Sequence, residues 1–248
     1  MNRVLLLLLL LITVRYGTAQ VPANGLSLWL QADKGTTLRQ DSLLTWADQG
    51  SEKHDAFSRT SNLPLLVPNA LNGLPAVRFN GMNNGMETPP FMTFPNKRGT
   101  IFMVVKINGR SSTSGVGVGN LVSTFHGNGT IWQFCASPAR FSYFDGTGAE
   151  GFQVSASLPA GWTMVTIVRR SDTIMDIYGG RRFERSFAVN NNQPALNSLK
   201  IGFNGRLGGT AMDSIPEVLN GEIAEIIMYN QALDESSLSS VHNYLSKK

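Results

Sequence analysis

Apolar and polar residues alternate along several short segments of the chain. In LSLWLQAD (residues 26–33) the three leucines alternate with Ser27, Trp29 and Gln31. This period of two is typical of a β-strand that buries one face. The segment GTIFMVVKING (99–109) is instead apolar on both faces, which indicates a strand covered on two sides. Further strand-like segments are LLTWADQG (43–50), GLPAVRFNG (73–81), WTMVTIVRR (162–170), DTIMDIYGGRRFERSFAV (172–189), SLKIGFNG (198–205) and GEIAEIIMYN (221–230).

Turn-forming residues separate these segments. The chain has 25 glycines, and Asn-Gly pairs at 80–81, 84–85, 108–109, 128–129, 204–205 and 220–221 mark turns. A helical pattern stands near the end, where Asp234 is a candidate N-cap and Leu238, Val241 and Leu245 fall on one face. The sequence predicts an all-β protein, a two-sheet antiparallel jelly-roll β-sandwich with a short C-terminal helix.

The first residues have the layout of a secretory signal peptide. A basic start, MNR, precedes an apolar run from Val4 to Val14, and small residues follow at 17 and 19. A membrane span needs about 20 apolar residues, whereas Arg15 ends this run earlier. We therefore expect residues 1–19 to be removed and residues 20–248 to form one jelly-roll domain without membrane insertion. We expect this mature chain to be secreted, and so extracellular or periplasmic.

Charge and cysteine content narrow the function. The formal net charge is +4, and it falls to +2 once Arg3 and Arg15 leave with the signal segment. The paired basic residues are not interleaved with aromatic residues, so we expect no nucleic-acid partner. The single cysteine, Cys135, allows no internal disulfide, and its place in TIWQFC indicates a buried strand position.

Four segments, in this order, resemble the laminin-G-like branch of the concanavalin A-like lectin/glucanase superfamily. They are LSLWLQADKG (26–35), WADQGSEKHDA (46–56), LNGLPAVRFNGMNNGME (71–87) and GEIAEIIMYNQALDESSLSSVHNYL (221–245). The second lacks the usual Ser-Gly order and asparagines of the family's turn. The resemblance implies a jelly-roll of two antiparallel sheets, one of them often concave. Because this superfamily holds lectins, adhesive modules and glycoside hydrolases, the fold does not decide the function.

Glu222 and Glu225 are the candidates for a catalytic acid pair. A glycosidase needs two carboxyl groups on one side of the sugar, about 5 Å apart for retention or about 6.5–9.5 Å apart for inversion. Along a regular strand, residues three apart point to opposite faces, although a β-bulge between them would restore a common face. The related glucanases also carry a third acid between their glutamates, where this chain has Ala224. We expect structural roles for both glutamates, with catalysis as the weaker alternative.

A sugar site needs an aromatic platform with polar groups around it. The segments HGNGTIWQF (126–134) and ARFSYFDGTG (139–148) supply Trp132, Gln133, Arg140, Tyr143 and Asp145 as candidate ligand-binding residues. If the two segments pair as strands, Trp132 and Tyr143 can lie on the same face. Aromatic residues on strands are more often core residues, and that alternative stays open.

Calcium is the cofactor to consider, because several relatives of this fold bind it. The ion takes about six to eight oxygen ligands, commonly from carboxylates and loop carbonyls. Asp48 and Asp55 flank one tight turn, and Asn84 and Glu87 lie in another. Asp and Asn are also common in turns for conformational reasons alone, so a calcium site and ordinary turns are both open.

Together these patterns favour a secreted, non-catalytic binding module whose partner is a glycan or a surface protein. Carbohydrate binding, as in a lectin, or adhesion to a cell surface or matrix is the main prediction. One alternative is a glycoside hydrolase or polysaccharide lyase with an atypical acid site. Another is a structural module that binds protein.

Overall fold

The computed structural model describes residues 21–58, 61–114, 117–126, 129–138, 140–144, 161–189, 196–204 and 217–248. The expected signal segment, 1–19, lies outside them. The elements are β1 Leu26–Gln31, β2 Thr36–Arg39, β3 Ser42–Trp46, β4 Ala56–Phe57, β5 Leu65–Leu71, β6 Leu74–Asn80, β7 Met86–Phe91, η1 Pro95–Lys97, β8 Gly99–Ile107, β9 Gly119–His126, β10 Gly129–Ser137, β11 Arg140–Phe144, β12 Trp162–Arg169, β13 Ile174–Gly179, β14 Arg182–Ala188, β15 Asn197–Ile201, β16 Asn220–Tyr229 and α1 Glu235–Leu245.

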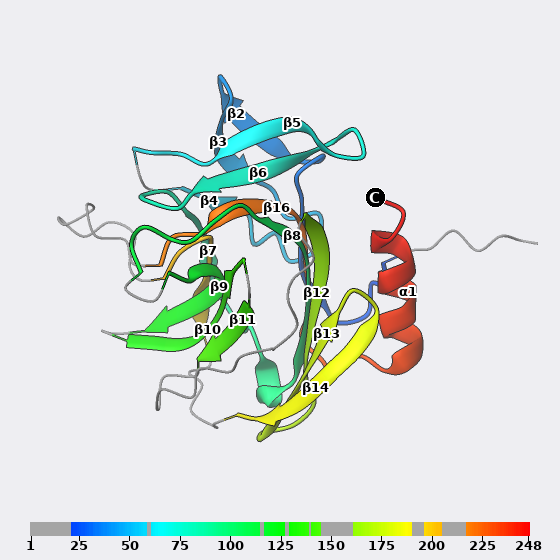
Figure 1. Ribbon diagram of the computed structural model, residues 1–248. Helices are drawn as coiled ribbons and strands as arrows, with labels where there is room; N and C mark the ends of the chain where they lie inside the picture. Colours follow the sequence, from blue (N-terminus) through cyan, green and yellow to red (C-terminus); the bar gives the residue numbers. More distant parts are fainter. Residues whose placement is uncertain are drawn as a thin grey trace, which may run out of the picture.

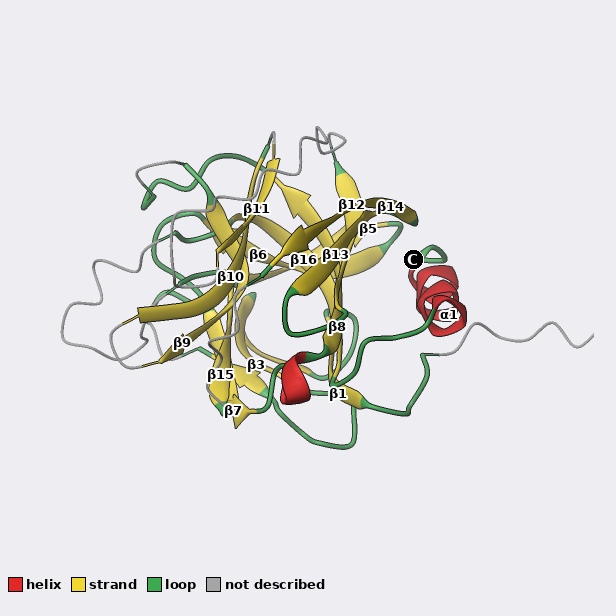
Figure 2. Ribbon diagram, turned by 90° about the horizontal axis from the view of Figure 1, so that it is seen from below, coloured by secondary structure: helices red, strands yellow, loops and turns green. Residues whose placement is uncertain are grey.

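The strands form two facing layers, and every pairing among the described strands is antiparallel. The first layer, the helix-side sheet, has the order β5-β6-β16-β8-β12-β13-β14, with β1 also paired to β16. The second, the opposing sheet, has the order β3-β4-β7-β15-β9-β10-β11. The register pair Ser42–Leu65 joins β3 to β5 between the layers. Figures 1 and 2 show α1 outside the helix-side sheet, with the opposing strands β9 and β10 on the far side. This architecture confirms the predicted all-β sandwich with one C-terminal helix.

Alternate residues of each strand fill the space between the layers. Leu28 and Leu30 of β1 are fully buried there, as their alternation predicts. The opposing sheet contributes Trp46 and Trp132, each fully buried. Because inward positions on both sheets are apolar, burial of this shared face is the main source of the fold's stability.

The helix α1 covers a second apolar cluster, on the outer face of the helix-side sheet. Leu238, Val241 and Leu245 of the helix are buried against this face. Asp234 accepts a hydrogen bond of 2.8 Å from the backbone N–H of Ser237, which confirms the predicted N-cap. The sheet is therefore apolar on both faces where the helix lies, as its central strand GTIFMVVKING predicts.

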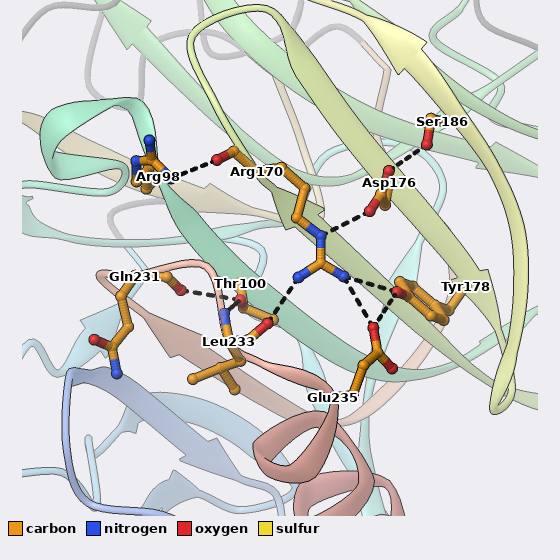
Figure 3. Close-up of polar contacts among 9 residues, drawn as sticks. All are labelled: Arg98, Thr100, Arg170, Asp176, Tyr178, Ser186, Gln231, Leu233 and Glu235. Atoms are coloured by element: carbon orange, nitrogen blue, oxygen red, sulfur yellow. Dashed lines mark hydrogen bonds and ion pairs between the residues drawn. The ribbon is translucent and has the colours of Figure 1, made fainter.

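Arg170 links the residues before α1 to the helix-side sheet through hydrogen bonds (Figure 3). The guanidinium of Arg170 donates to Asp176 Oδ2 at 2.7 Å, to Tyr178 Oη at 2.9 Å and to the Leu233 carbonyl at 2.8 Å. Thr100 contacts the same segment, because its hydroxyl accepts a hydrogen bond from the backbone N–H of Leu233 at 3.0 Å. These contacts join the residues before α1 to strands β8 and β13 of the helix-side sheet.

The central strand β16 carries a β-bulge at Ala224. Against β8, Ile223 is opposite Val105 and Glu225 is opposite Val104, so Ala224 is an extra residue. On its other edge, β16 pairs with β6 over residues 220–223 and with β1 from Glu225 onward. The bulge therefore lies where β16 exchanges one edge partner for another.

Within the described part of the chain, no helix is long and apolar enough to cross a membrane.

Candidate functional site

The bulge corrects the predicted orientation of the two glutamates. Ile223 and Ile226 both belong to the core between the sheets, whereas Ala224 and Ile227 belong to the cluster on the outer face. Two residues in succession, Ala224 and Glu225, therefore face outward. Glu222 and Glu225 consequently lie on the same outer face of the helix-side sheet, contrary to the expectation for a regular strand.

Glu222 is held by a cation at the start of β16. Arg78 of the neighbouring strand donates to Glu222 Oε1 through Nε at 3.0 Å and through Nη2 at 2.8 Å. The Glu222 side chain is 2% exposed, while that of Arg78 is 45% exposed. Lys106 is the register partner of Glu222 on the opposite side, in β8. The ion pair with Arg78 offsets part of the cost of burying the Glu222 carboxylate.

Glu225 lies at the centre of a different group of residues, under the last turn of α1. Its carboxylate accepts a hydrogen bond of 2.6 Å from the indole Nε1–H of Trp29 on β1. Its other oxygen is 2.6 Å from the Lys248 ammonium. The side chain of Glu225 is only 1% exposed, so the contact with Lys248 offsets much of the cost of burying this charge.

Trp29 and Tyr244 form a partly exposed aromatic pair above this carboxylate. Their rings meet edge to face, with centroids 5.9 Å apart and an interplanar angle of 83°. Gln31 donates from its side-chain amide to the Tyr244 hydroxyl at 2.8 Å. Asp33, in the turn after β1, accepts a hydrogen bond from Lys248 at 3.1 Å. We call these residues the Trp29–Tyr244 site; they are Trp29, Gln31, Asp33, Glu225, Tyr244 and Lys248.

Burial sets the protonation behaviour of this site. It raises the pKa of Glu225, and the nearby charge of Lys248 partly offsets that increase. Burial also raises the pKa of Tyr244, and the charge of Glu225 raises it further. The hydroxyl of Tyr244 is therefore neutral at physiological pH, so it can donate to the Glu225 carboxylate while it accepts from Gln31.

Trp132 and Tyr143, predicted as the aromatic platform for a sugar, lie in the core. Strands β10 and β11 do pair, as expected, and the two side chains share a face. That face points inward, and Trp132 is 0% and Tyr143 3% exposed. Phe134 lies between them, with ring centroids 5.7 Å from Trp132 and 4.9 Å from Tyr143. These residues are packed against other aromatic rings, so they present no exposed stacking surface.

The other three predicted sugar ligands fall in different places. Gln133 alternates with Trp132 and so points to the outer face of the opposing sheet, where it is 8% exposed. Arg140 begins β11 opposite Ser137. Asp145 lies outside the described residues. The lone cysteine, Cys135, is buried on β10, as its neighbours predicted.

Gln133 belongs to a polar row that crosses the outer face of the opposing sheet. Glu87, Lys200, Ser123 and Gln133 are successive register partners on β7, β15, β9 and β10. Each is at most 8% exposed, and Lys200 forms an ion pair with Glu87. Nearby Asn120 donates to Gln133 Oε1 at 3.1 Å. Ser123 donates to the Phe203 carbonyl, so the members of the row are satisfied partly by each other and partly by neighbouring residues. This is typical of a buried polar network that stabilises a sheet face.

The predicted calcium ligands are divided among three places and have other partners. The carboxylate of Asp48 accepts backbone hydrogen bonds from Trp29, Gly50 and His54 at 2.8–2.9 Å. Asp55 accepts from the backbone N–H of Asp48 at 2.8 Å, and Asn84 accepts from the backbone N–H of Asn80 at 3.0 Å. Glu87 is paired with Lys200. Among the described residues, no three His, Cys, Asp or Glu side chains are grouped as metal ligands.

The fold defines the protein's class as an antiparallel β-sandwich with one helix on an outer face. No protein-family model matches the chain, and no curated protein sequence matches it. The fold is similar to that of domain 4 of AbnA, a GH43 extracellular arabinanase from Geobacillus stearothermophilus, solved in complex with arabinotriose. The alignment covers 89% of this chain and 100% of the arabinanase domain, with a TM-score of 0.64 and 13% sequence identity.

Two further solved structures share the fold. Trypanosoma rangeli sialidase in complex with sialic acid aligns with 91% of this chain at a TM-score of 0.61 and 17% identity. The botulinum neurotoxin serotype D binding domain aligns with 89% of this chain and 52% of its own, at a TM-score of 0.61 and 13% identity. This chain covers only 34% of the length of the sialidase chain. At these identities the similarity establishes the fold alone.

The alternation along residues 26–33 puts Trp29 and Gln31 on the polar side of β1 but does not mark them as site residues. The feature that points to a site is an aromatic residue, Trp29, on the non-core side of an alternating strand. Asp33 continues the same alternation two residues after Gln31. Tyr244 and Lys248 could not be found in this way, because they reach the site from the C-terminal helix and the residues after it.

Proposed function

We propose that this protein is a secreted, non-catalytic binding module of the laminin-G-like type and that it binds carbohydrate at the Trp29–Tyr244 site. The observation that carries the proposal is the partly exposed Trp29–Tyr244 pair beside hydrogen-bonding side chains. An indole or phenol ring can cover the apolar face of a pyranose, while carboxylate and amide groups bind its hydroxyls.

The neighbouring structures support this proposal by their own ligands. The arabinanase domain, which the chain covers completely, was solved with arabinotriose, and the sialidase was solved with sialic acid. The toxin neighbour is a binding domain. These ligands belong to those proteins, and only the shared sandwich connects them with this chain.

Binding without cleavage agrees with the ion pairs that Glu222 and Glu225 form on the outer face of the helix-side sheet. Arg78 neutralises Glu222, and Lys248 neutralises Glu225. A retaining or inverting mechanism instead requires one carboxyl group free to protonate the leaving group and a second free to act as nucleophile or base. The hydrolase or lyase alternative would need both ion pairs to open, and the protein-binding alternative would not need the aromatic pair.

A glycan array followed by calorimetric titration tests the proposal. We expect Trp29→Ala to weaken binding of an array-positive oligosaccharide about tenfold or more, which corresponds to about 1.4 kcal/mol. Trp162→Ala is the matched control, because Trp162 is also partly buried on the outer face and donates its indole N–H to the Ala70 carbonyl at 2.9 Å. Equal affinities for Trp29→Ala and wild type would refute the site. Release of reducing sugar, abolished by Glu225→Gln, would favour the hydrolase alternative, and no binding to any glycan would favour the protein-binding one.

A further inference from the structure

An ammonium group already occupies the Trp29–Tyr244 site. The Nζ atom of Lys248 lies 2.6 Å from Glu225 Oε2 and 3.1 Å from Asp33 Oδ1. It is also 5.5 Å from the centroid of the Tyr244 ring. Two carboxylates and an aromatic face are the groups that bind an alkylammonium, through charge-assisted hydrogen bonds and a cation–π contact.

The site has more acceptor capacity than Lys248 uses. Glu225 and Asp33 both contact the single ammonium group of Lys248. Gln31 is 4% exposed and its side-chain amide donates to Tyr244, yet its Oε1 has no hydrogen-bond partner among the described residues. A buried acceptor without a partner costs free energy, and a ligand that carries both an ammonium and hydroxyl groups would supply one.

The position of Lys248 contrasts with that of its neighbour. The Lys248 side chain is 13% exposed and folds over the sheet, whereas Lys247 is exposed. Lys248 also comes from a segment beyond the last turn of α1, so it reaches Glu225 from outside the strands that build the site. A group attached in this way competes with a free ligand for the same acceptors.

We propose that the Trp29–Tyr244 site is selective for a primary ammonium group and that Lys248 occupies the position of that group as a tethered competitor. This inference rests on the carbohydrate binding proposed above, and it names the substrate class as glycans with free 2-amino groups, such as β-1,4-linked glucosamine oligomers. The aromatic pair takes the sugar ring, and Glu225 and Asp33 take the amine.

The experiment compares three trisaccharides, glucosamine trimer, N-acetylglucosamine trimer and cellotriose, by calorimetry at pH 6.0, where the amines are largely protonated. The proteins are wild type, Lys248→Met, Lys247→Met as the matched control, and Glu225→Gln. We expect Lys248→Met to bind glucosamine trimer at least about tenfold more tightly than wild type and Lys247→Met do, a gain that corresponds to about 1.4 kcal/mol. Affinities for the two trisaccharides without a free amine should stay unchanged, and Glu225→Gln should lose the preference for the amine.

The two proposals fail in different ways. If trisaccharides bind in a Trp29-dependent manner but glucosamine trimer gains nothing from Lys248→Met, the ammonium selectivity is wrong and carbohydrate binding stands. If no trisaccharide binds, carbohydrate binding fails, and n-butylammonium then tests the ammonium site alone through the NMR signal of the Trp29 indole N–H. A saturable shift of that signal supports the ammonium site, and no shift refutes it. The butylammonium titration is also made on wild type at higher concentration, so the test holds even if Lys248→Met does not fold.

Discussion

The imidazole Nε2 of His242 lies 2.9 Å from the hydroxyl oxygen of Thr166, in the apolar layer between α1 and the helix-side sheet. The ring also meets Phe102 edge to face, with centroids 5.4 Å apart. Burial lowers the pKa of His242, the charge of Arg181 lowers it further, and Glu235 offsets part of this effect. The helix is therefore packed against the sheet through a neutral histidine.

We predict that this histidine makes the fold sensitive to mild acid. Because its pKa is lower in the folded state than the ordinary value of 6.5, the unfolded chain takes up a proton first as the pH falls. Stability from this group is present above pH 6.5 and is lost as the pH falls from there through the folded-state pKa. Thermal unfolding of wild type and His242→Gln between pH 7.5 and 5 should show a smaller acid-induced decrease in the variant. Parallel curves would contradict the assignment.

We predict that Arg170→Lys loosens α1. A lysine ammonium cannot reproduce the three-way contact with Asp176, Tyr178 and the Leu233 carbonyl. We expect a loss of about 1.5–3 kcal/mol in the free energy of unfolding. The control, Arg182→Lys, changes an arginine whose side chain is 77% exposed, and its effect should stay within about 0.5 kcal/mol. Urea denaturation followed by circular dichroism measures both, and equal losses would show that the network is not what holds the helix.

Substitution of Trp132 should mainly lower stability, whereas substitution of Trp29 should mainly lower the affinity for oligosaccharide. Trp132→Phe keeps an aromatic ring in the core, so it should cost stability while leaving the affinity for a bound oligosaccharide unchanged. Trp132→Ala should destabilise by about 3–5 kcal/mol, because the side chain is fully buried between the sheets. Trp29→Ala should instead reduce affinity more than stability. Loss of oligosaccharide binding in a folded Trp132→Phe protein would show that the binding site involves β10 and β11 instead.

Gly202 should tolerate alanine far less well than Gly73 does. Both glycines have left-handed backbone angles, with φ of +79° and +84°, so both substitutions carry a cost of about 1 kcal/mol. A Cβ atom at Gly202 would also lie 2.2 Å from the Phe79 ring, whereas nothing lies within 4 Å at Gly73. We expect a further loss of about 1–3 kcal/mol for Gly202→Ala. Similar unfolding midpoints for the two variants would show that Phe79 moves aside freely.

The sequence determines the local structure more fully than it determines the site. Alternation in LSLWLQAD predicts Leu28 and Leu30 in the core, and the pattern after Asp234 predicts it as the N-cap. Both features are predictable because they depend on neighbours within a few residues. The bulge at Ala224 could not be read from GEIAEIIMYN, since it arises where β16 leaves β6 and pairs with β1. The orientation of Glu225 and its contact with Lys248 follow from that exchange of partners.

The same exchange has a consequence for how the chain folds. Residues 220–229 must pair with β1, about 200 positions earlier, and with β6 and β8 before the helix-side sheet is continuous. Until that segment has been synthesised, the edges of those earlier strands are open to wrong partners. Pairings between such distant parts of a chain slow folding. The helix-side sheet should therefore be completed late, and before then the chain should depend on chaperones or dilution to avoid aggregation.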